Sequence, residues 1–247
     1  MARFLFLTIK FFLVLLNIIS LPLIFFITNT KMKNIFNSAF CIILFCAIGY
    51  AQKPCPGIPT ITYAGKIYHT VQVGSQCWLK ENLNIGVMID SAKNQTNNHS
   101  IEKYCYRNDP ANCIKYGGLY QWNEALQYAS GTSKIKGICP AGWHLPDTSD
   151  FNKLTLIVNN NSKSLKALGQ GDGAGIGTNN SGFSALLSGS RGLNGAFFGL
   201  NSYTYIWASS VANSTDSYDL YLNRPGSYIY QSDSQVDYGF SVRCIKN

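Results

Sequence analysis

The chain has 247 residues and a formal net charge of +8, from 20 lysines and arginines against 12 aspartates and glutamates. Half of this charge lies before Gln52, on Arg3, Lys10, Lys31 and Lys33, so the rest of the chain is only mildly basic. Nucleic-acid-binding proteins gather lysine and arginine on one face or stripe, and no such run follows Gln52. We therefore exclude nucleic acid as a partner.

Two apolar runs occupy the N-terminal region, at residues 4–27 and 35–48. The second has the parts of a secretory signal peptide. Met32 begins a short basic start, and Gly49 and Ala51 put small residues where a signal peptidase binds. We therefore expect an exported protein. An uncleaved N-terminal anchor is the alternative, and we expect membrane contact only through the signal or such an anchor.

The expected processing divides the chain into three parts. Residues 1–51 comprise an upstream extension and the signal peptide, with the true start at Met32 and cleavage before Gln52. Residues 52–62 form a short N-terminal segment. Residues 63–247 form one domain, which is long enough for a substantial hydrophobic core.

Six cysteines follow the expected cleavage site, and an even number in an exported chain predicts three disulfide bonds. Six cysteines can pair in many ways, and sequence alone does not choose among them. A metal site is disfavoured, because no Cys-x-x-Cys occurs and the three histidines are scattered. The cysteines are Cys55, Cys77, Cys105, Cys113, Cys139 and Cys244.

The first elements after the cleavage site are predicted strands. β-branched and aromatic residues alternate with polar ones, which is typical of strands buried on one face. We expect strands at residues 60–63, 67–73 and 77–79, separated by turns at Gly65 and at residues 74–75. The polar residues 82–100 that follow predict a loop.

A first amphipathic helix is predicted at residues 121–129. Its apolar residues fall on one helical face. They are Trp122, Ala125, Leu126 and Ala129.

A second helix is predicted after the loop ICPAGWHLPD, residues 138–147. Pro146 ends the extended segment, Asp147 is a good N-cap, and Asp150 follows three residues later. The apolar residues that follow have helical spacing, namely Phe151, Leu154, Ile157 and Val158. Residues 164–168 predict a short third helix.

The last part of the chain is predicted to be turn-rich β structure. The glycine-rich residues 169–177 do not match G-x-G-x-x-G and predict a flexible loop rather than a phosphate site. Helices early and strands late indicate the α+β class. The expected strands are residues 183–187, 196–200, 204–209, 218–222, 227–231 and 240–245.

Five segments of the chain, in this order, resemble the Fibrobacter succinogenes major paralogous domain family. The resemblance covers residues 63–247, and it implies an exported protein without an assigned activity. The segments are residues 68–83, 117–122, 139–146, 182–186 and 239–244.

Two segments are also similar, more distantly, to the formylglycine-generating sulfatase-modifying family. These are Trp143-His144-Leu145-Pro146 before a capped helix, and the closing residues 239–244. The resemblance implies a single C-type lectin-like α+β domain with two short helices, turn-rich antiparallel strands and long loops. A shared fold does not by itself carry function across.

The first of these resemblances implies a disulfide between Cys139 and Cys244, which tend to occur together in that family. Cys105 and Cys113 enclose a segment with turn residues that a short bridge could close. Cys55 with Cys77 then remains.

Cys139 and His144 could instead form a nucleophile and its base. A reactive cysteine needs a lowered pKa, usually at a helix N-terminus or beside a cation, but Cys139 lies well before the cap at Asp147. We expect His144 to be packed and bonded to backbone.

Asp216 and Asp219 are expected at exposed strand ends. We assign structural roles to Trp78, Trp122, Trp143, His144, Pro146, Asp147, Trp207 and Arg243.

No catalytic residue, metal ligand or cofactor is expected. Formylglycine-generating enzymes use a late cysteine pair with copper, and only Cys244 lies late here. The calcium-lectin tripeptides Glu-Pro-Asn and Gln-Pro-Asp are absent, and Trp122-Asn123-Glu124 only approximates a calcium-ligand motif.

The sequence is most consistent with an exported, noncatalytic binding module for an unknown glycan or protein at the cell surface. Tyrosines on loops give adaptable contacts, so the candidate ligand-binding residues are Tyr203, Tyr205, Tyr228 and Tyr230. The alternatives are an enzyme related to the formylglycine-generating family, which predicts a free thiol or bound copper, and a structural envelope or matrix component.

Overall fold

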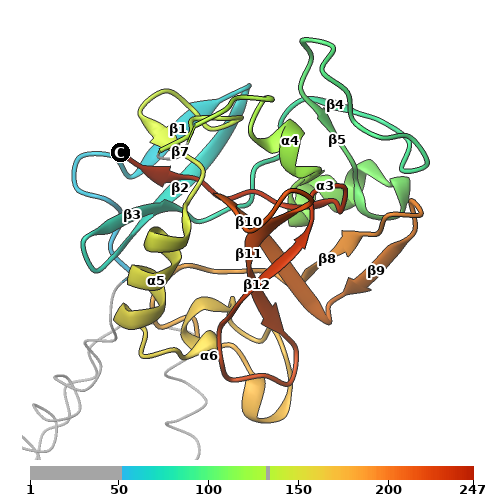
Figure 1. The fold of residues 1–247 in the computed structure, drawn as a ribbon. Helices are drawn as coiled ribbons and strands as arrows, with labels where there is room; N and C mark the ends of the chain where they lie inside the picture. Colours follow the sequence, from blue (N-terminus) through green and yellow to red (C-terminus); the bar gives the residue numbers. More distant parts are fainter. Residues whose placement is uncertain (1–51, 132–133) are drawn as a thin grey trace, which may run out of the picture. The chain divides into compact units, whose positions relative to one another are not determined.

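The computed structural model describes residues 52–131 and 134–247 (Figure 1). The expected upstream extension and signal peptide at residues 1–51 lie outside these residues, so the expected cleavage stays a prediction. In the described part no helix is both long and apolar enough to cross a membrane.

A five-stranded sheet joins the beginning of the domain to its end. The strand order is β1-β2-β3-β14-β7, and all pairs are antiparallel. The last strand therefore lies between β3 and β7, next to the segment that precedes the main helix (Figure 1). The strands are β1 Thr60–Tyr63, β2 Lys66–Val73, β3 Gln76–Leu79, β7 Trp143–His144 and β14 Ile245–Lys246.

A seven-stranded sheet forms the second half of the domain. Its main path is β12-β11-β10-β13-β6, and β8 pairs with both β10 and β9. The long strands β10, β11 and β12 are antiparallel neighbours, whereas β13 and β8 run parallel to β10. The strands are β6 Leu119–Tyr120, β8 Ser188–Arg191, β9 Phe197–Leu200, β10 Tyr203–Val211, β11 Asp216–Asn223, β12 Tyr230–Gln235 and β13 Phe240–Ser241.

The remaining elements are short. β4 and β5 form a parallel pair, and the helices occupy the connections between strands. They are β4 Val87–Met88, β5 Glu102–Lys103, η1 Tyr106–Asn108, α3 Pro110–Tyr116, α4 Trp122–Ala125, α5 Thr148–Ile157, α6 Ser162–Leu165 and η2 Gly173–Gly175. The described domain is thus α+β, with mostly antiparallel strands and few short helices.

One face of the seven-stranded sheet packs on a hydrophobic core. Ile206 of β10 and Leu220 and Leu222 of β11 alternate with outward residues and are fully or almost fully buried. They pack in one cluster with Phe151 of α5 and with Trp78 of β3, whose ring stacks on that of Phe151 at 6.1 Å. Because this core takes up one face of β10 and β11, the side chains that alternate with Ile206, Leu220 and Leu222 make their contacts on the opposite face.

The predicted helix at residues 121–129 is wrong in length, because α4 ends at Ala125. The carbonyl of Ala125 accepts a hydrogen bond from the Ile138 amide at 2.9 Å, so it does not accept one from Ala129. Gln127 and Tyr128 then take φ values of 54° and 55°, a left-handed conformation that ends a helix.

Three predicted strands also need correction. Residues 183–187 do not form a strand, because Ser184 has φ of 58° and its amide donates to the Asn179 side chain. The strand expected at residues 227–231 begins at Tyr230, since the Ser227 carbonyl accepts from the Ser162 amide. The strand expected at residues 240–245 is two strands, β13 and β14, in different sheets.

The helix boundaries show two further differences. The short third helix covers Ser162–Leu165 rather than residues 164–168. The helix α3 was not predicted. It begins at Pro110 after the N-cap Asp109, whose side chain accepts from the Ala111 amide. A proline at the first helical position after an aspartate N-cap indicates the start of a helix. The segment was instead interpreted as a turn, because its residues are also typical of turns.

Candidate functional site

A row of tyrosines crosses the face of the seven-stranded sheet that points away from the Ile206 core. Because paired residues of antiparallel strands lie on the same face, the register places Tyr205 of β10 opposite Tyr221 of β11, and Tyr221 opposite Tyr230 of β12. The ring centroids of these neighbours are 4.6 Å and 6.0 Å apart. Three strands therefore present three adjacent phenol rings.

Two further tyrosines extend this surface. Tyr203 meets the rings of Tyr205 and Tyr221 at 5.4 Å and 6.2 Å. On the other side Phe240, which is buried, stacks on Tyr205 at 4.4 Å and on Tyr238 at 5.6 Å. We refer to the five tyrosines as the tyrosine row, namely Tyr203, Tyr205, Tyr221, Tyr230 and Tyr238.

The row is partly accessible, and Tyr205 and Tyr238 pack against the core cluster that contains Trp207 and Phe240. Tyr230 is 46% exposed and the other four rings are half-buried. Burial raises the pKa of Tyr203 and of Tyr205 above the usual 10, so both hydroxyls stay protonated at neutral pH. A neutral phenol can donate and accept a hydrogen bond while its ring offers an apolar surface.

Asp219 lies on the same face, two residues before Tyr221 and opposite Trp207. It is fully buried, and the Ser232 hydroxyl donates to its Oδ1 at 2.6 Å. Within the described residues its Oδ2 and the neighbouring Ser217 Oγ have no hydrogen-bond partner. Burial raises the pKa of Asp219 to about 6. The expected exposed position of Asp219 is therefore wrong, because Asp219 lies within the sheet between Trp207 of β10 and Ser232 of β12.

The structure places three of the four predicted ligand-binding residues in the row. Tyr203, Tyr205 and Tyr230 belong to it, but they lie on strands rather than on loops. Tyr228 is 60% exposed and lies outside the row, just before β12. Tyr221 was missed, although its alternation with the apolar residues 220 and 222 was a signal for the outward face.

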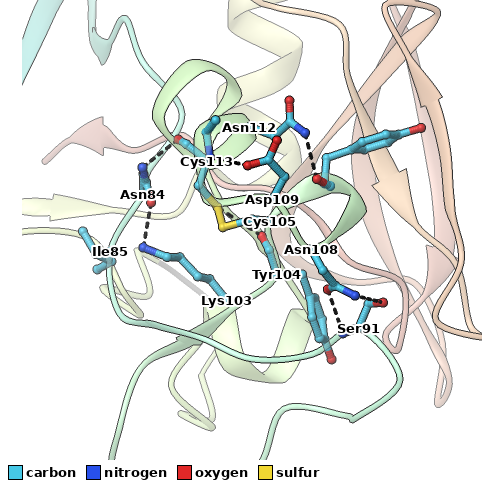
Figure 2. Close-up of a disulfide and its surroundings, with 12 residues drawn as sticks. Asn84, Ile85, Ser91, Lys103, Tyr104, Cys105, Asn108, Asp109, Asn112 and Cys113 are labelled. Atoms are coloured by element: carbon cyan, nitrogen blue, oxygen red, sulfur yellow. Dashed lines mark hydrogen bonds between the residues drawn. A yellow bond between two sulfur atoms is a disulfide. The ribbon is translucent and has the colours of Figure 1, made fainter.

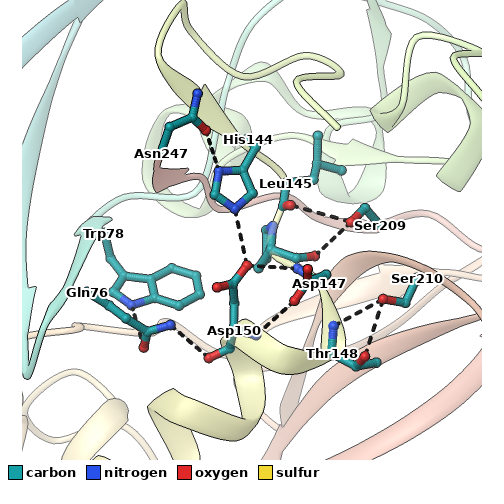
Figure 3. A network of polar contacts seen from close by, with 11 residues as sticks. Gln76, Trp78, His144, Leu145, Asp147, Thr148, Asp150, Ser209, Ser210 and Asn247 are labelled. Carbon is teal, nitrogen blue, oxygen red and sulfur yellow. Dashed lines mark hydrogen bonds and ion pairs between the residues drawn. The ribbon is translucent and has the colours of Figure 1, made fainter. Parts of the chain in front are cut away.

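The predicted Cys139 and His144 pair has a different arrangement from that of a nucleophile and its base. Cys139 is bonded to Cys244, and His144 is buried between two side chains (Figure 3). Its Nδ1 lies 2.6 Å from Asn247 Oδ1, and its Nε2 lies 3.2 Å from Asp150 Oδ2. The expected bond from His144 to backbone is therefore wrong.

The cause of this difference is the capping box of α5. Asp147 accepts from the Asp150 amide, and the Asp150 carboxylate turns back to the Asp147 amide, which brings it within reach of His144 (Figure 3). The His144 contact and the Asp147 amide lower the pKa of Asp150, although burial, the largest influence, acts in the opposite direction. This cluster holds β7, α5 and the C-terminal residue together.

The other residues with predicted structural roles are buried to different degrees. Trp78, Trp143, Trp207 and Arg243 are buried. Trp122 is only partly buried, and its Nε1 donates to the Ala208 carbonyl at 2.8 Å. Pro146 accepts a backbone hydrogen bond from Ser209 at 2.7 Å, which ties the segment before α5 to β10.

Three disulfides join the pairs that the sequence analysis named. Cys105–Cys113 encloses η1 and the start of α3 (Figure 2). Cys55–Cys77 ties the N-terminal segment to β3, and Cys139–Cys244 ties the segment before β7 to the C-terminal strand. In the part of the chain that the structure describes, no group of three or more His, Cys, Asp or Glu residues could hold a metal ion.

Comparison with known proteins gives one match. A protein-family model described as the Fibrobacter succinogenes major domain matches residues 71–246. No curated protein and no solved structure matches the chain.

Proposed function

The chain belongs to the Fibrobacter succinogenes major domain family, and we propose that it is an exported, noncatalytic module that binds carbohydrate on the tyrosine row. The observation that carries the proposal is the register of three strands, which sets Tyr205, Tyr221 and Tyr230 side by side with accessible rings. Neighbouring strands fix the spacing of these rings, so the surface is formed before a ligand arrives.

The chemistry of the row favours a sugar over a protein partner. A sugar ring has a face of C–H groups that packs on an aromatic ring, and hydroxyls that bond to phenol oxygens. The core of a protein interface is depleted in serine and in charged residues, whereas the residues that follow Tyr230 on its own face of β12 are Ser232 and Ser234. We therefore take an extended glycan as the ligand.

Export is supported by the disulfides. Bonds of this kind form and persist in oxidising compartments and are rare in a reducing cytoplasm. All six cysteines from Cys55 to Cys244 are paired. This pairing also supports a noncatalytic role, because an enzyme related to the formylglycine-generating family would need a free thiol.

We also propose that the domain is C-type lectin-like. The proposal is supported by the position of β14 between β3 and β7, which closes the N-terminal sheet with the end of the chain, and by the long connections between the two sheets. Superposition of an experimental structure on a C-type lectin domain tests this assignment.

Single alanine substitutions in the row test carbohydrate binding. We expect Tyr221→Ala and Tyr230→Ala each to weaken binding of the secreted full chain to an array of neutral and acidic polysaccharides by about 10-fold or more, because each removes one stacking surface from a continuous row. Tyr230→Phe should keep most of the affinity if stacking dominates. Affinity is measured on the best polysaccharide by isothermal titration calorimetry.

Tyr228→Ala is the matched control, since Tyr228 is a more exposed tyrosine outside the row. We expect it to bind as the unmodified protein does. Equal affinity of Tyr221→Ala, Tyr230→Ala and the unmodified protein, with unchanged thermal unfolding, would contradict the proposal. If no polysaccharide binds but a protein partner is lost with the same two variants, the row is a protein interface instead.

A further inference from the structure

A cavity of about 660 Å³ lies apart from the tyrosine row, none of whose residues lines it. Residues from β2, α3 and the segment after β3 line it, together with Arg243 near the C-terminus. Asn82 in its wall donates to Ser241 Oγ at 3.1 Å, and Ser241 is in register with Ile206 on the core side of the sheet. The volume is that of a small-molecule site.

The charged residues of this cavity are mostly cations. Lys66, Lys80, Lys115 and Arg243 line it, and none of the four forms an ion pair with the described residues. The one lining acid is Glu81, and His69 occupies both of its oxygens through its amide and its Nδ1, each at 2.8 Å. Four cations therefore line the cavity against one carboxylate, which leaves the lining with an excess of positive charge.

A fifth cation adds to this charge from just beyond the cavity wall. The Lys103 Nζ donates to Asn84 Oδ1 at 2.7 Å, and Asn84 lines the cavity (Figure 2). Burial and then the charge of Lys66 lower the pKa of Lys103. Burial also lowers the pKa of Lys66.

Arg243 is a buried cation held by neutral groups alone. Its Nε and Nη2 donate to Asn82 Oδ1 at 3.1 Å and 2.8 Å, and its Nη1 donates to the Phe183 carbonyl. Its guanidinium lies 4.3 Å above the Phe183 ring. These contacts use three of the five N–H groups of a guanidinium. A buried charge without a charged partner is costly, and an anion in the cavity would reduce that cost.

The mouth of the cavity also has an apolar part. Ile67 is 66% exposed on β2, and Ile114 is 82% exposed on α3. Both line the cavity, as does Leu186. Exposed isoleucines beside uncompensated cations suit a ligand that has both an anionic group and an apolar body.

We propose that this cavity is a second binding site, for an organic anion of small-molecule size. The lysines and Arg243 hold a carboxylate, sulfate or phosphate group, and Ile67 and Ile114 contact the apolar part of the ligand. The site does not depend on the proposed carbohydrate surface, because the two share no residue.

Binding of three small aromatic anions to the full chain tests this site. The probes are benzoate, phenyl sulfate and phenyl phosphate, and benzyl alcohol is the uncharged analogue. We expect saturable binding of at least one anion by ligand-observed NMR and isothermal titration calorimetry, weaker binding at high salt, and at least 10-fold weaker binding of benzyl alcohol. The anion that binds best identifies the class of acidic group.

Charge-removing variants locate the binding. Lys66→Gln combined with Lys115→Gln should weaken anion binding about 10-fold or more, because both changes remove charge and keep most of the side-chain length. Lys93→Gln is the matched control, an exposed lysine that does not line the cavity, and should leave binding unchanged. Arg243 is left intact, since its loss could unfold the core.

Two further measurements test this proposal separately from the proposal of carbohydrate binding. Tyr221→Ala should bind the anions normally, and the lysine double variant should bind polysaccharide normally. Three results would overturn the proposal: no binding of any of the three anions at millimolar concentration, equal affinity for benzyl alcohol, or unchanged anion affinity of the double variant with an intact fold.

Discussion

Asp219 shows how one residue can set a pH response in the half of the domain that contains the seven-stranded sheet. Its carboxylate is fully buried on β11, which lies between β10 and β12, with one oxygen bonded to Ser232 and the other without a partner in the described residues. Moving an ionised carboxylate out of water is unfavourable, so the folded state favours the protonated form. Its pKa rises from 3.8 to about 6 as a result.

This shift predicts that protonation of Asp219 stabilises the fold. Between about pH 4 and pH 6 the folded protein keeps a proton that the unfolded chain has lost, so the contribution of Asp219 to stability falls as pH rises through this window. Asp219→Asn should remove this dependence and stabilise the protein at pH 7 by about 2 kcal/mol. Urea unfolding at several pH values measures the difference.

Asp90→Asn provides the control, because Asp90 is exposed and is not among the charges that act on Asp219. We expect its pH profile to match that of the unmodified protein. If the stability of Asp219→Asn and that of the unmodified protein change equally with pH between about pH 4 and pH 6, the buried carboxylate does not control stability in this range.

At the scale of single residues, the sequence predicted burial better than bonding partners. Trp78, Trp143 and Trp207 lie in apolar runs and are buried, as such runs indicate. The partners of His144 depend on Asn247, which is distant in sequence and reaches it only because β14 pairs with β7. No local pattern contains that information.

Among the elements, α5 is the helix whose start the sequence specified most completely. Asp147 and Asp150 form a reciprocal capping box, and Phe151 and Leu154 bury one face of the helix. Ile157, expected on the same face, is 42% exposed because it lies at the end of the helix. The N-cap satisfies amides that the helix itself leaves without partners.

Removing this cap should destabilise the protein measurably. We expect Asp147→Ala to lower the free energy of unfolding by about 1 kcal/mol, because the Asp150 amide loses its acceptor. The matched control is Asp172→Ala, since Asp172 precedes η2 without a side-chain cap and its ion pair with Arg224 is exposed. It should cost less than about 0.5 kcal/mol. Equal losses in chemical denaturation would contradict the assigned role of the cap.

The elements that the sequence mispredicted are those decided by distant partners. The carbonyl of Ala125, which ends α4, is taken by Ile138, and the closing strand divides because β13 and β14 pair in different sheets. The tyrosine row illustrates the same limit. Tyr221 was not predicted, because only the pairing with Tyr205 and Tyr230 shows that three strands form one surface.

At the scale of the whole molecule, the disulfide between Cys139 and Cys244 joins distant parts of the chain. The two cysteines are 105 positions apart, whereas Cys105 and Cys113 are 8 apart. The long bridge also lies in the core cluster that contains Trp143 and Val242. Only family resemblance suggested this pair, since the spacing of six cysteines is compatible with many others.

The two bridges should therefore differ in their effect on global stability. Closing a longer loop removes more conformational entropy from the unfolded chain, so replacing Cys139 and Cys244 together by alanine should cost roughly 4 to 5 kcal/mol. The same change at Cys105 and Cys113 should cost roughly 2 to 3 kcal/mol, with its structural effect concentrated near α3 and the cationic cavity. Urea unfolding of both double variants measures the two losses in the free energy of unfolding. Equal losses would mean that strain or residual structure, rather than loop entropy, sets the contribution of each bridge.

Loss of anion binding in the second variant alone would connect the short bridge to the cavity, because that bridge fixes Cys113, which lines it.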